Sequence, residues 1–306
     1  MGDIRQKALK KRLSERARIV QAIRSFFIGR GFLEVDTPLR LPGILPEAHI
    51  DAEESGTWFL QTSPESCMKR LMASGLPKIF QICKCFRQNE RGSKHLPEMT
   101  LLEWYEEGKT YLDLMVRCEE LIRFVAEAAG CSDALSYSGR RISLKDSWER
   151  LSVEDAFNRY TSMDVNRALE TGAFDACMGL EIEPRLGIET PLFLIDYPPE
   201  KGAFATIRPG YPPVAERFEL YIAGLELCNA FTELTDPVEQ RERFSQENGS
   251  RESMGKRPYP MPEKFLDALE DMPEAAGAAL GVDRLVMLLT DSPHIDDVTA
   301  FAPEEL

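Results

Sequence analysis

The segment Ile82–Tyr105, ICKCFRQNERGSKHLPEMTLLEWY, decides how this chain is interpreted. Two apolar stretches flank a long polar connection, which predicts two strands joined by a loop. Arg87 directly follows the first strand, where a guanidinium is able to hold a phosphate or carboxylate through two hydrogen bonds. The other polar residues of the connection are Asn89, Glu90, Arg91, Lys94 and His95. A solvated charged loop is the alternative, and two further stretches favour the anion site.

The segment Phe218–Phe231 predicts a second hairpin, with Ala and Gly at 223–224 as its turn. A two-residue turn places Glu226 opposite Tyr221 and projects Glu219 from the same sheet face. Two carboxylates this close need a cation between them, and their hard oxygen atoms suit Mg²⁺. An exposed acidic strand is the alternative interpretation.

Composition predicts a soluble globular protein, with 43% hydrophobic and 29% charged residues among 306. No apolar run approaches the ~18 residues of a membrane span, and the basic N-terminus has no apolar signal region. Seven cysteines without a paired CxxC framework suit a reducing cytoplasm, which is the expected location. Cys83 and Cys85 share one strand face, and packing explains them better than metal binding.

Charge is unevenly distributed along the chain, whose net charge is −14. Residues 1–30 hold nine Lys or Arg against two acidic residues, so this head carries +7 and the remainder −21. RNA is bound mainly through Lys and Arg on phosphates, so an acidic body argues against stable tRNA binding. The basic head is either the solvated face of a helix or a contact for RNA or an acidic protein.

Helices and strands are mixed without βαβ alternation, which predicts an α+β fold with a mostly antiparallel sheet. Apolar residues at helical spacing predict a helix that ends at Arg30, before Gly31. They are Ile19, Ile23, Phe26 and Phe27. A strand is expected over Phe32–Pro38 and another over Pro191–Pro198. Further helices are expected from Leu112 through Val125 and near Lys145–Tyr160 and Asp164–Leu180.

Three stretches together resemble the motifs of class II aminoacyl-tRNA synthetases. GFLEVDTPLR at 31–40 resembles motif 1, Ile82–Tyr105 resembles motif 2, and GAALGVDRLVML at 277–288 resembles motif 3. QTSPESCMKRL at 61–71 and the segment Glu216–Asp236 are similar to the lysine-type branch. The resemblance implies one class II catalytic domain over 1–306 and a homodimer. An anticodon-binding barrel is not expected ahead of Gly31, because five strands do not fit there.

The resemblance also implies ATP and Mg²⁺ as cofactors, with two arginines in the catalytic role. Arg87 would bind the α-phosphate and the substrate carboxylate, Arg284 would hold the γ-phosphate, and Glu219 with Glu226 would carry Mg²⁺. Gly281 would let the adenosine approach the backbone, since glycine has no Cβ. The implied nucleotide-binding residues are Arg87, Gln88, Asn89, His95, Leu96, Met99, Glu226, Leu227, Gly281 and Arg284.

The matched substrate positions imply a pocket for lysine or β-lysine, because buried ammonium groups need carboxylates in place of water. These positions are Ser63, Pro64, Glu65, Glu103, Tyr105, Asn229, Glu233 and Ala279. Short members of this branch without an anticodon module pass (R)-β-lysine to a lysine side chain of elongation factor P. Ala279 falls where those transferases have alanine and the tRNA-charging enzymes have glycine.

Three residues depart from the family pattern, namely Asn89 in place of glutamate, Leu96 in place of asparagine and Met99 in place of phenylalanine. Asn still accepts an amino hydrogen bond and Met still covers a ring face, so a lowered ATP affinity is expected rather than a dead enzyme. Two alternatives stay open. One is an adenylate-forming ligase with another acceptor, such as a tRNA in trans or a free amine. The other is a paralogue that binds lysine or nucleotide without turnover.

Overall fold

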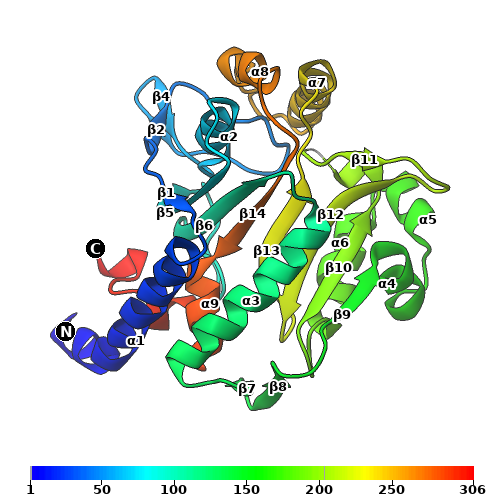
Figure 1. Cartoon of the computed structure of the whole chain (residues 1–306). Helices are drawn as coiled ribbons and strands as arrows, with labels where there is room; N and C mark the ends of the chain where they lie inside the picture. Colours follow the sequence, from blue (N-terminus) through cyan, green and yellow to red (C-terminus); the bar gives the residue numbers. More distant parts are fainter. Residues whose placement is uncertain (1, 203) are drawn as a thin grey trace.

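A nine-stranded sheet runs through the centre of the molecule (Figure 1). The computed structural model describes residues 2–202 and 204–306. Most neighbouring strands are antiparallel, and the described parallel pairs are β1 with β5 and β9 with β10. In spatial order the strands are β1 (Leu33–Glu34), β5 (Lys78–Phe86), β6 (Glu98–Glu107), β14 (Ala275–Gly281), β13 (Leu225–Thr232), β12 (Val214–Ile222), β10 (Leu192–Tyr197) and β9 (Glu149–Ser152), with β11 (Ile207–Arg208) beside β12.

Alternation along the strands gives this sheet two different faces. On β6, Leu102 and Trp104 are fully buried in the main core, whereas Glu103 and Tyr105 point to the opposite face and line a pocket. On β12, Phe218 and Leu220 likewise lie in the main core, whereas Glu219 lines a cavity on the opposite face. One face of the sheet is therefore apolar, and the other carries the chemically active side chains.

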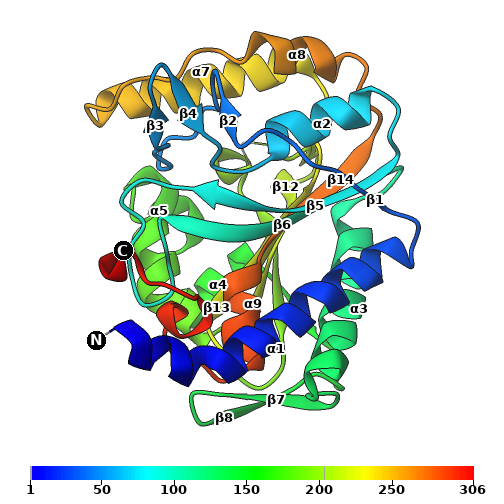
Figure 2. The ribbon, with the colours of Figure 1, turned by 90° about the vertical axis from the view of Figure 1, so that its left-hand side faces the viewer.

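Two long helices cover the apolar face, α1 (Gly2–Ile28) and α3 (Tyr111–Ala129). Figure 1 shows α3 lying across the central strands, and Figure 2 shows α1 beside it. The helix α9 (Val282–Leu289), most of which belongs to the segment 277–288, packs against β6, β13 and α1. These helices hold the sheet from one side and leave the polar face open.

The polar face is flanked by two smaller cores. One involves α4 (Val153–Tyr160), α5 (Val165–Glu170), α6 (Phe174–Cys177) and the π-helix η1 (Met178–Ile182), which the 3₁₀ turn η2 (Glu183–Arg185) follows in sequence. The other involves α2 (Glu65–Ala73), α7 (Pro237–Ser253) and α8 (Glu263–Leu269), which lie together at the top of Figure 2. The remaining elements are β2 (Arg40–Leu41), β3 (Glu54–Ser55), β4 (Trp58–Leu60), β7 (Ala134–Tyr137), β8 (Arg140–Ser143), η3 (Pro199–Lys201), η4 (Ile295–Val298) and η5 (Pro303–Glu305).

The structure confirms the α+β fold with a mostly antiparallel sheet and corrects some element boundaries. The expected helix over Lys145–Tyr160 is wrong in its first half, because Glu149–Ser152 pairs with β10 as an edge strand. Ser152 then caps α4 by accepting the Asp155 N–H, so the helix begins only at Val153. The strand expected over Phe32–Pro38 shortens to Leu33–Glu34, the residues in register with Ile79 and Phe80 of β5.

The basic head folds back on the acidic body, so several of its cations are paired within the chain. The helix follows the expected spacing, with Ile19, Ile23, Phe26 and Phe27 buried. Arg16 lies 2.6 Å from Asp283, and Arg24 lies 2.8 Å from Glu34.

In the part of the chain that the structure describes, every helix is too short or too polar to cross a bilayer.

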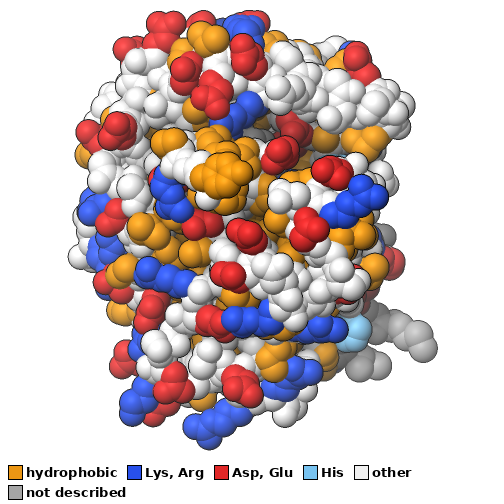
Figure 3. Space-filling view, turned by 90° about the vertical axis from the view of Figure 1, so that its right-hand side faces the viewer, with side chains coloured by type: hydrophobic (Ala, Val, Ile, Leu, Met, Phe, Trp, Pro, Cys, Tyr) orange, Lys and Arg blue, Asp and Glu red, His pale blue; other side chains and the backbone are white. Residues whose placement is uncertain are grey.

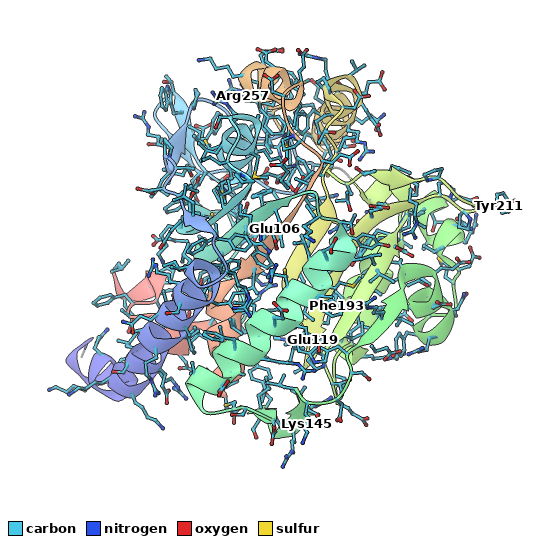
Figure 4. All side chains as sticks on the ribbon, in the orientation of Figure 1. Glu106, Glu119, Lys145, Phe193, Tyr211 and Arg257 are labelled. Carbon is cyan, nitrogen blue, oxygen red and sulfur yellow. The ribbon has the colours of Figure 1, made fainter. Side chains whose placement is uncertain are left out.

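One ion pair ties the sheet to α3, and one loop projects away from the body. Glu106 accepts hydrogen bonds from Arg117 at 2.9 and 3.1 Å, and Figure 4 labels this carboxylate close to α3. Tyr211 lies in the loop before β12 and is fully exposed, at the edge of the molecule in Figure 4.

All seven cysteines are free thiols. Cys83 and Cys85 do share a strand face, with their Sγ atoms 3.9 Å apart.

Candidate active site

The β5–β6 hairpin presents Arg87 to the polar face, directly after β5 ends at Phe86. The backbone N–H of Arg87 donates to the Pro97 carbonyl at 2.9 Å, which closes the base of the loop. Its guanidinium has only a long contact of 3.8 Å with Glu90, and its buried Nε has no hydrogen-bond partner among the described residues. A buried donor without a partner is costly unless a ligand supplies the acceptor. Arg87 is thus arranged to receive an anion.

The β12–β13 hairpin forms with the register expected from its turn. Ala223 and Gly224 both have positive φ, as a type I′ turn requires, and Tyr221 pairs with Glu226. Glu219 accepts hydrogen bonds from the Tyr221 hydroxyl at 2.5 Å and from Arg217 at 2.6 Å. Both carboxylates project from the polar face and line one cavity.

Arg284, in the first turn of α9, is the internal partner of Glu226. Its Nη1 donates to the Glu226 carboxylate at 3.1 Å and to the Glu226 carbonyl at 2.7 Å, while Nη2 contacts His95. Burial raises the pKa of Glu226, but the Arg284 charge and hydrogen bond outweigh it and leave that pKa below the usual value. Burial and the same Arg284 charge lower the pKa of His95. A positive charge therefore lies beside a neutral imidazole.

Glu219 behaves differently from its neighbour. Burial of the Glu219 carboxyl raises its pKa, with Arg217 opposing and Glu226 adding to the rise. A third carboxylate, Glu183 of η2, has its pKa raised to about 7 by burial and by the charges of Glu219 and Glu226. Excess negative charge in an enclosed site attracts a cation. No group of three or more metal-ligating side chains occurs within the described residues, so an ion here would take its remaining ligands from phosphate or water.

These two hairpins and α9 enclose a cavity of about 530 Å³, large enough for a nucleotide. All but one of the expected nucleotide and metal residues line it. They are Arg87, Asn89, His95, Leu96, Met99, Glu219, Glu226, Leu227, Gly281 and Arg284. Gln88 does not line this cavity, and its backbone N–H donates to the Asp51 carbonyl at 2.7 Å. A Cβ on Gly281 would meet only the Arg284 side chain, at 3.7 Å or more, so no protein atom requires glycine there.

A smaller pocket of about 80 Å³ adjoins the large cavity, and Arg87, Asn229 and Ala279 line both. Ser63, Glu65, Glu103 and Tyr105 also line it, as the resemblance implied. Pro64 does not, because it forms the N-cap of α2. Tyr105 donates to one Glu103 oxygen at 3.1 Å, and the other oxygen, Oε1, is buried without a partner in the described chain. Burial raises the pKa of Glu103 well above its usual value, and the Glu65 charge adds to this rise while Lys69 opposes it.

Beneath the small pocket lies a buried cluster built around Lys69, a residue that sequence reasoning did not single out. Lys69 is 1% exposed, and its Nζ lies 2.5 Å from a carboxylate oxygen of Glu65 and 2.5 Å from one of Glu233. The Phe204 and Phe231 rings lie 5.1 and 5.3 Å from the same nitrogen. Glu233 therefore lies behind the pocket wall, where Lys69 holds it.

Gly277 lets the strand β14 pass close to this cluster. A Cβ at that position would lie 2.2 Å from a Glu233 oxygen and 2.3 Å from the Tyr105 ring. Such a contact is impossible without displacing both side chains. Glycine at 277 is therefore required for the close packing of two pocket residues.

Other site residues also escaped sequence reasoning. Asp283 accepts the Thr100 N–H at 2.7 Å and pairs with Arg16, so it fastens α9 to β6 and α1. Glu47 lines both cavities from the loop after β2. For Lys69 a signal existed, because Glu65 and Lys69 have the i, i+4 spacing of a helical ion pair. No local pattern marked Asp283 or Glu47, since their partners are remote in sequence.

The fold and this site define a class II synthetase core, and comparison with known families agrees. Residues 1–305 match the model for tRNA synthetases class II (D, K and N). The chain belongs to this family.

The curated relatives narrow the likeness to the lysine branch. The chain is 37% identical over 308 residues to the elongation factor P–(R)-β-lysine ligase of Vibrio atlanticus (strain LGP32), covering 95% of both chains. It is 38% identical to the enzyme of the same name from Erwinia tasmaniensis, covering 94% of each. It is also 37% identical to the lysine–tRNA ligase of Moorella thermoacetica, of which the match covers 64%. These similarities confirm the family resemblance inferred from the motifs.

Proposed function

We propose that the protein is a ligase that activates lysine, preferably (R)-β-lysine, with ATP and transfers it to a lysine side chain of elongation factor P. The carrying observation is the junction of two cavities at Arg87, one suited to a nucleotide and the other lined by carboxylates. Relatives named for this activity match along nearly their whole length, which supports the same proposal. Activation needs position and charge rather than a side-chain nucleophile.

In this proposal the arginines neutralise the phosphates during adenylate formation. Arg87 contacts the α-phosphate and the substrate carboxylate, which both bear charge at the junction of the cavities. Arg284 leaves Glu226 and turns to the γ-phosphate, with His95 beside it. Glu219 and Glu226 would hold Mg²⁺, which neutralises the leaving pyrophosphate when bound. Before Mg²⁺ binds, Glu219 pairs with Arg217 and Glu226 pairs with Arg284, so each carboxylate has its own counter-ion.

The amino-acid pocket suits a diamino acid by its charge. Glu65 and Glu103 line it, Glu233 lies behind its wall, and Lys69 pairs with both Glu65 and Glu233. When all three carboxyls are ionised around a bound diamino acid, two negative charges remain, which equals the number of ammonium groups on lysine or β-lysine. The unpartnered Oε1 of Glu103 is an acceptor for one of them.

The three departures from the family pattern fall on the adenine side of this proposal. Asn89, Leu96 and Met99 all line the large cavity, and Asn89 has a positive φ of 63°. An amide and a thioether still provide an acceptor and a ring contact. We therefore favour an active enzyme with reduced ATP affinity over a protein that binds its ligands without turnover.

The same proposal includes a cytoplasmic homodimer that binds no tRNA stably. Ile28 and Leu33 are exposed apolar side chains on α1 and β1, the helix and strand that the family resemblance assigns to the dimer interface, and Val116 and Phe124 are exposed on α3, which contacts α1. Light scattering at micromolar concentration tests the dimer, and a monomer would contradict it. Charges of both signs are interspersed over the face shown in Figure 3, which together with the net charge of −14 argues against a tRNA surface.

Pyrophosphate exchange into ATP, followed by intact-mass analysis of elongation factor P, tests the function. We expect exchange that depends on lysine or β-lysine, and a mass increase of one acyl group on the factor. Exchange without that mass increase, but with charging of tRNA or a free amine, would favour the rival ligase. No exchange with any amino acid would favour the non-catalytic binder.

Ala279→Gly is expected to shift the preference toward α-lysine. Ala279 is paired between Glu103 and Asn229 on neighbouring strands and lines both cavities, so its methyl group shapes the pocket where the amino group shifts. One methyl group in a pocket changes discrimination by about tenfold or more. The measurement is the ratio of kcat/KM for β-lysine and α-lysine in exchange. Ala276→Gly, on the opposite sheet face, is the control, and an unchanged ratio in Ala279→Gly would contradict the assignment.

A further inference from the structure

Glu47 occupies the boundary between the two cavities, where the activated carbonyl group of the proposed reaction would lie. It is contributed by the loop 42–53, which joins β2 to β3 and lies near α7 in Figure 2. Glu47, Arg87 and Asn229 all line both cavities. A carboxylate at this point borders both the nucleotide cavity and the smaller amino-acid pocket.

The loop that carries Glu47 is fixed by bonds from a distant part of the chain. Arg251 of α7 is 3% exposed and donates to the carbonyls of Glu47 and Ile50, both at 3.0 Å, and to the Asp51 carboxylate at 3.0 Å. The Ala48 N–H donates to Glu247 at 2.6 Å. Buried charged hydrogen bonds of this kind hold a backbone in one geometry. The backbone at Glu47 is therefore fixed, and its half-buried side chain lines both cavities.

The negative charge of Glu47 is not needed to balance the two ammonium groups of the amino acid. When Glu65, Glu103 and Glu233 are all ionised, their three charges less that of Lys69 already match the two ammonium groups of a diamino acid. A further negative charge beside Arg87 would repel both the triphosphate and the substrate carboxylate. A carboxylate retained at such a place calls for a different role.

The transfer half of the proposed reaction supplies that role. The acceptor is a lysine side chain, whose unperturbed pKa of about 10.4 makes it an ammonium ion at neutral pH. An ammonium ion has no lone pair, so it must lose a proton before it attacks a carbonyl group. We propose, on the basis of the function above, that Glu47 attracts the acceptor ammonium and acts as the general base that deprotonates it.

The step balances without any further reactant. The Glu47 carboxylate takes one of the three protons of the acceptor ammonium, and the nitrogen lone pair attacks the carbonyl carbon of the acyl-adenylate. The new C–N bond forms as the C–O bond to the phosphate breaks, and AMP leaves with that electron pair. The remaining extra proton passes from the new amide nitrogen to water, and Glu47 returns its own proton to solvent.

The electrostatic surroundings agree with this assignment. Burial raises the pKa of Glu47 to about 7, with Glu65 and Glu247 adding to the rise and Arg87 and Arg217 opposing it. A general base works best when its pKa lies near the working pH. Glu47 is then ionised in a useful fraction of molecules at neutral pH and is basic enough to accept a proton.

The decisive experiment compares Glu47→Gln with the native protein in three assays. Lysine-dependent pyrophosphate exchange and hydroxamate formation with hydroxylamine, a neutral nucleophile, are expected within about threefold of native values, because neither needs this base. Acyl transfer to elongation factor P, or to Nα-acetyl-lysine amide, is expected to fall about 10²-fold. Glu54→Gln, on the exposed strand β3, is the control and should leave all three rates unchanged.

The pH profile separates a base from a merely structural residue. Native transfer should rise with pH and level off above about 7, whereas Glu47→Gln should keep rising into the alkaline range as the free amine accumulates. Native rates of transfer in Glu47→Gln would overturn the inference and leave the proposed function intact. A raised KM for lysine in exchange would also overturn it, since Glu47 would then bind the amino acid. Absence of exchange in the native protein would overturn both proposals.

Discussion

Arg87→Ala is expected to reduce lysine-dependent pyrophosphate exchange by at least about 10²- to 10³-fold, the scale of losing one charged donor from a transition state. Arg87 lines both cavities and has a buried Nε without a partner in the described chain, so its bonding capacity is directed at the ligands. Arg87→Lys should recover little, because an ammonium cannot donate two parallel hydrogen bonds. Exchange rates measured with saturating ATP and lysine give the comparison.

A matched control comes from the same loop. Arg91 also lines the large cavity, but its guanidinium is bound to Glu304 and Asp296, at 2.9 Å from each. Arg91→Ala should keep exchange within about tenfold of native. Arg87→Ala should unfold at nearly the native temperature, because its only described ion pair is a 3.8 Å contact with Glu90. Native exchange in Arg87→Ala would remove the phosphate clamp from the proposed mechanism.

Lys69→Met is expected to lower the free energy of unfolding by about 3–5 kcal/mol, the usual effect of removing one partner from a buried ion pair. Lys69 is 1% exposed and neutralises both Glu65 and Glu233, so its loss leaves two carboxylates facing each other in the interior. Burial and the Glu65 charge already raise the pKa of Glu233, while Lys69 opposes that rise. Urea unfolding of both proteins measures the difference.

The loss in Lys69→Met should also depend on pH. Without Lys69 the pKa of a buried carboxyl in the folded state rises further above its unfolded value, so the folded state binds more protons. Stability is then greatest below the unfolded pKa and falls as the pH rises through the folded pKa. The deficit should be smaller at pH 5 than at pH 8. Lys78→Met is the control, because its 3.5 Å pair with Glu106 is partly exposed and should cost less than about 1 kcal/mol. A similarly small loss in Lys69→Met would contradict the role of Lys69 as the counter-ion.

Local rules sufficed for the hairpins and for much of the site. The positive φ of Ala223 and Gly224 follows from a two-residue turn, and this turn alone sets Glu226 opposite Tyr221. Motif spacing likewise indicated Arg87 and Arg284, which the structure brings into one cavity. Such features depend on neighbours a few residues away, so the sequence pattern contains them.

Boundaries between elements were less predictable where tertiary pairing competes with helix propensity. Residues 149–152 have a helical pattern, yet they pair with β10 because an edge of the sheet is available to them. Leu33–Glu34 is a strand only where β5 lies alongside. The sheet, assembled from distant segments, decides these cases.

By itself the sequence determined the family, the antiparallel sheet and the pairing of the acidic strand residues, because turn chemistry, alternation and motif order act over short distances. Only the tertiary structure decided which charges meet. Glu47 depends on Arg251, about two hundred residues away, and Lys69 meets Glu233 only when α2 packs against the sheet. Burial strengthens the interaction between two charges and shifts the pKa of an ionisable group. A group becomes buried only after remote segments have come together.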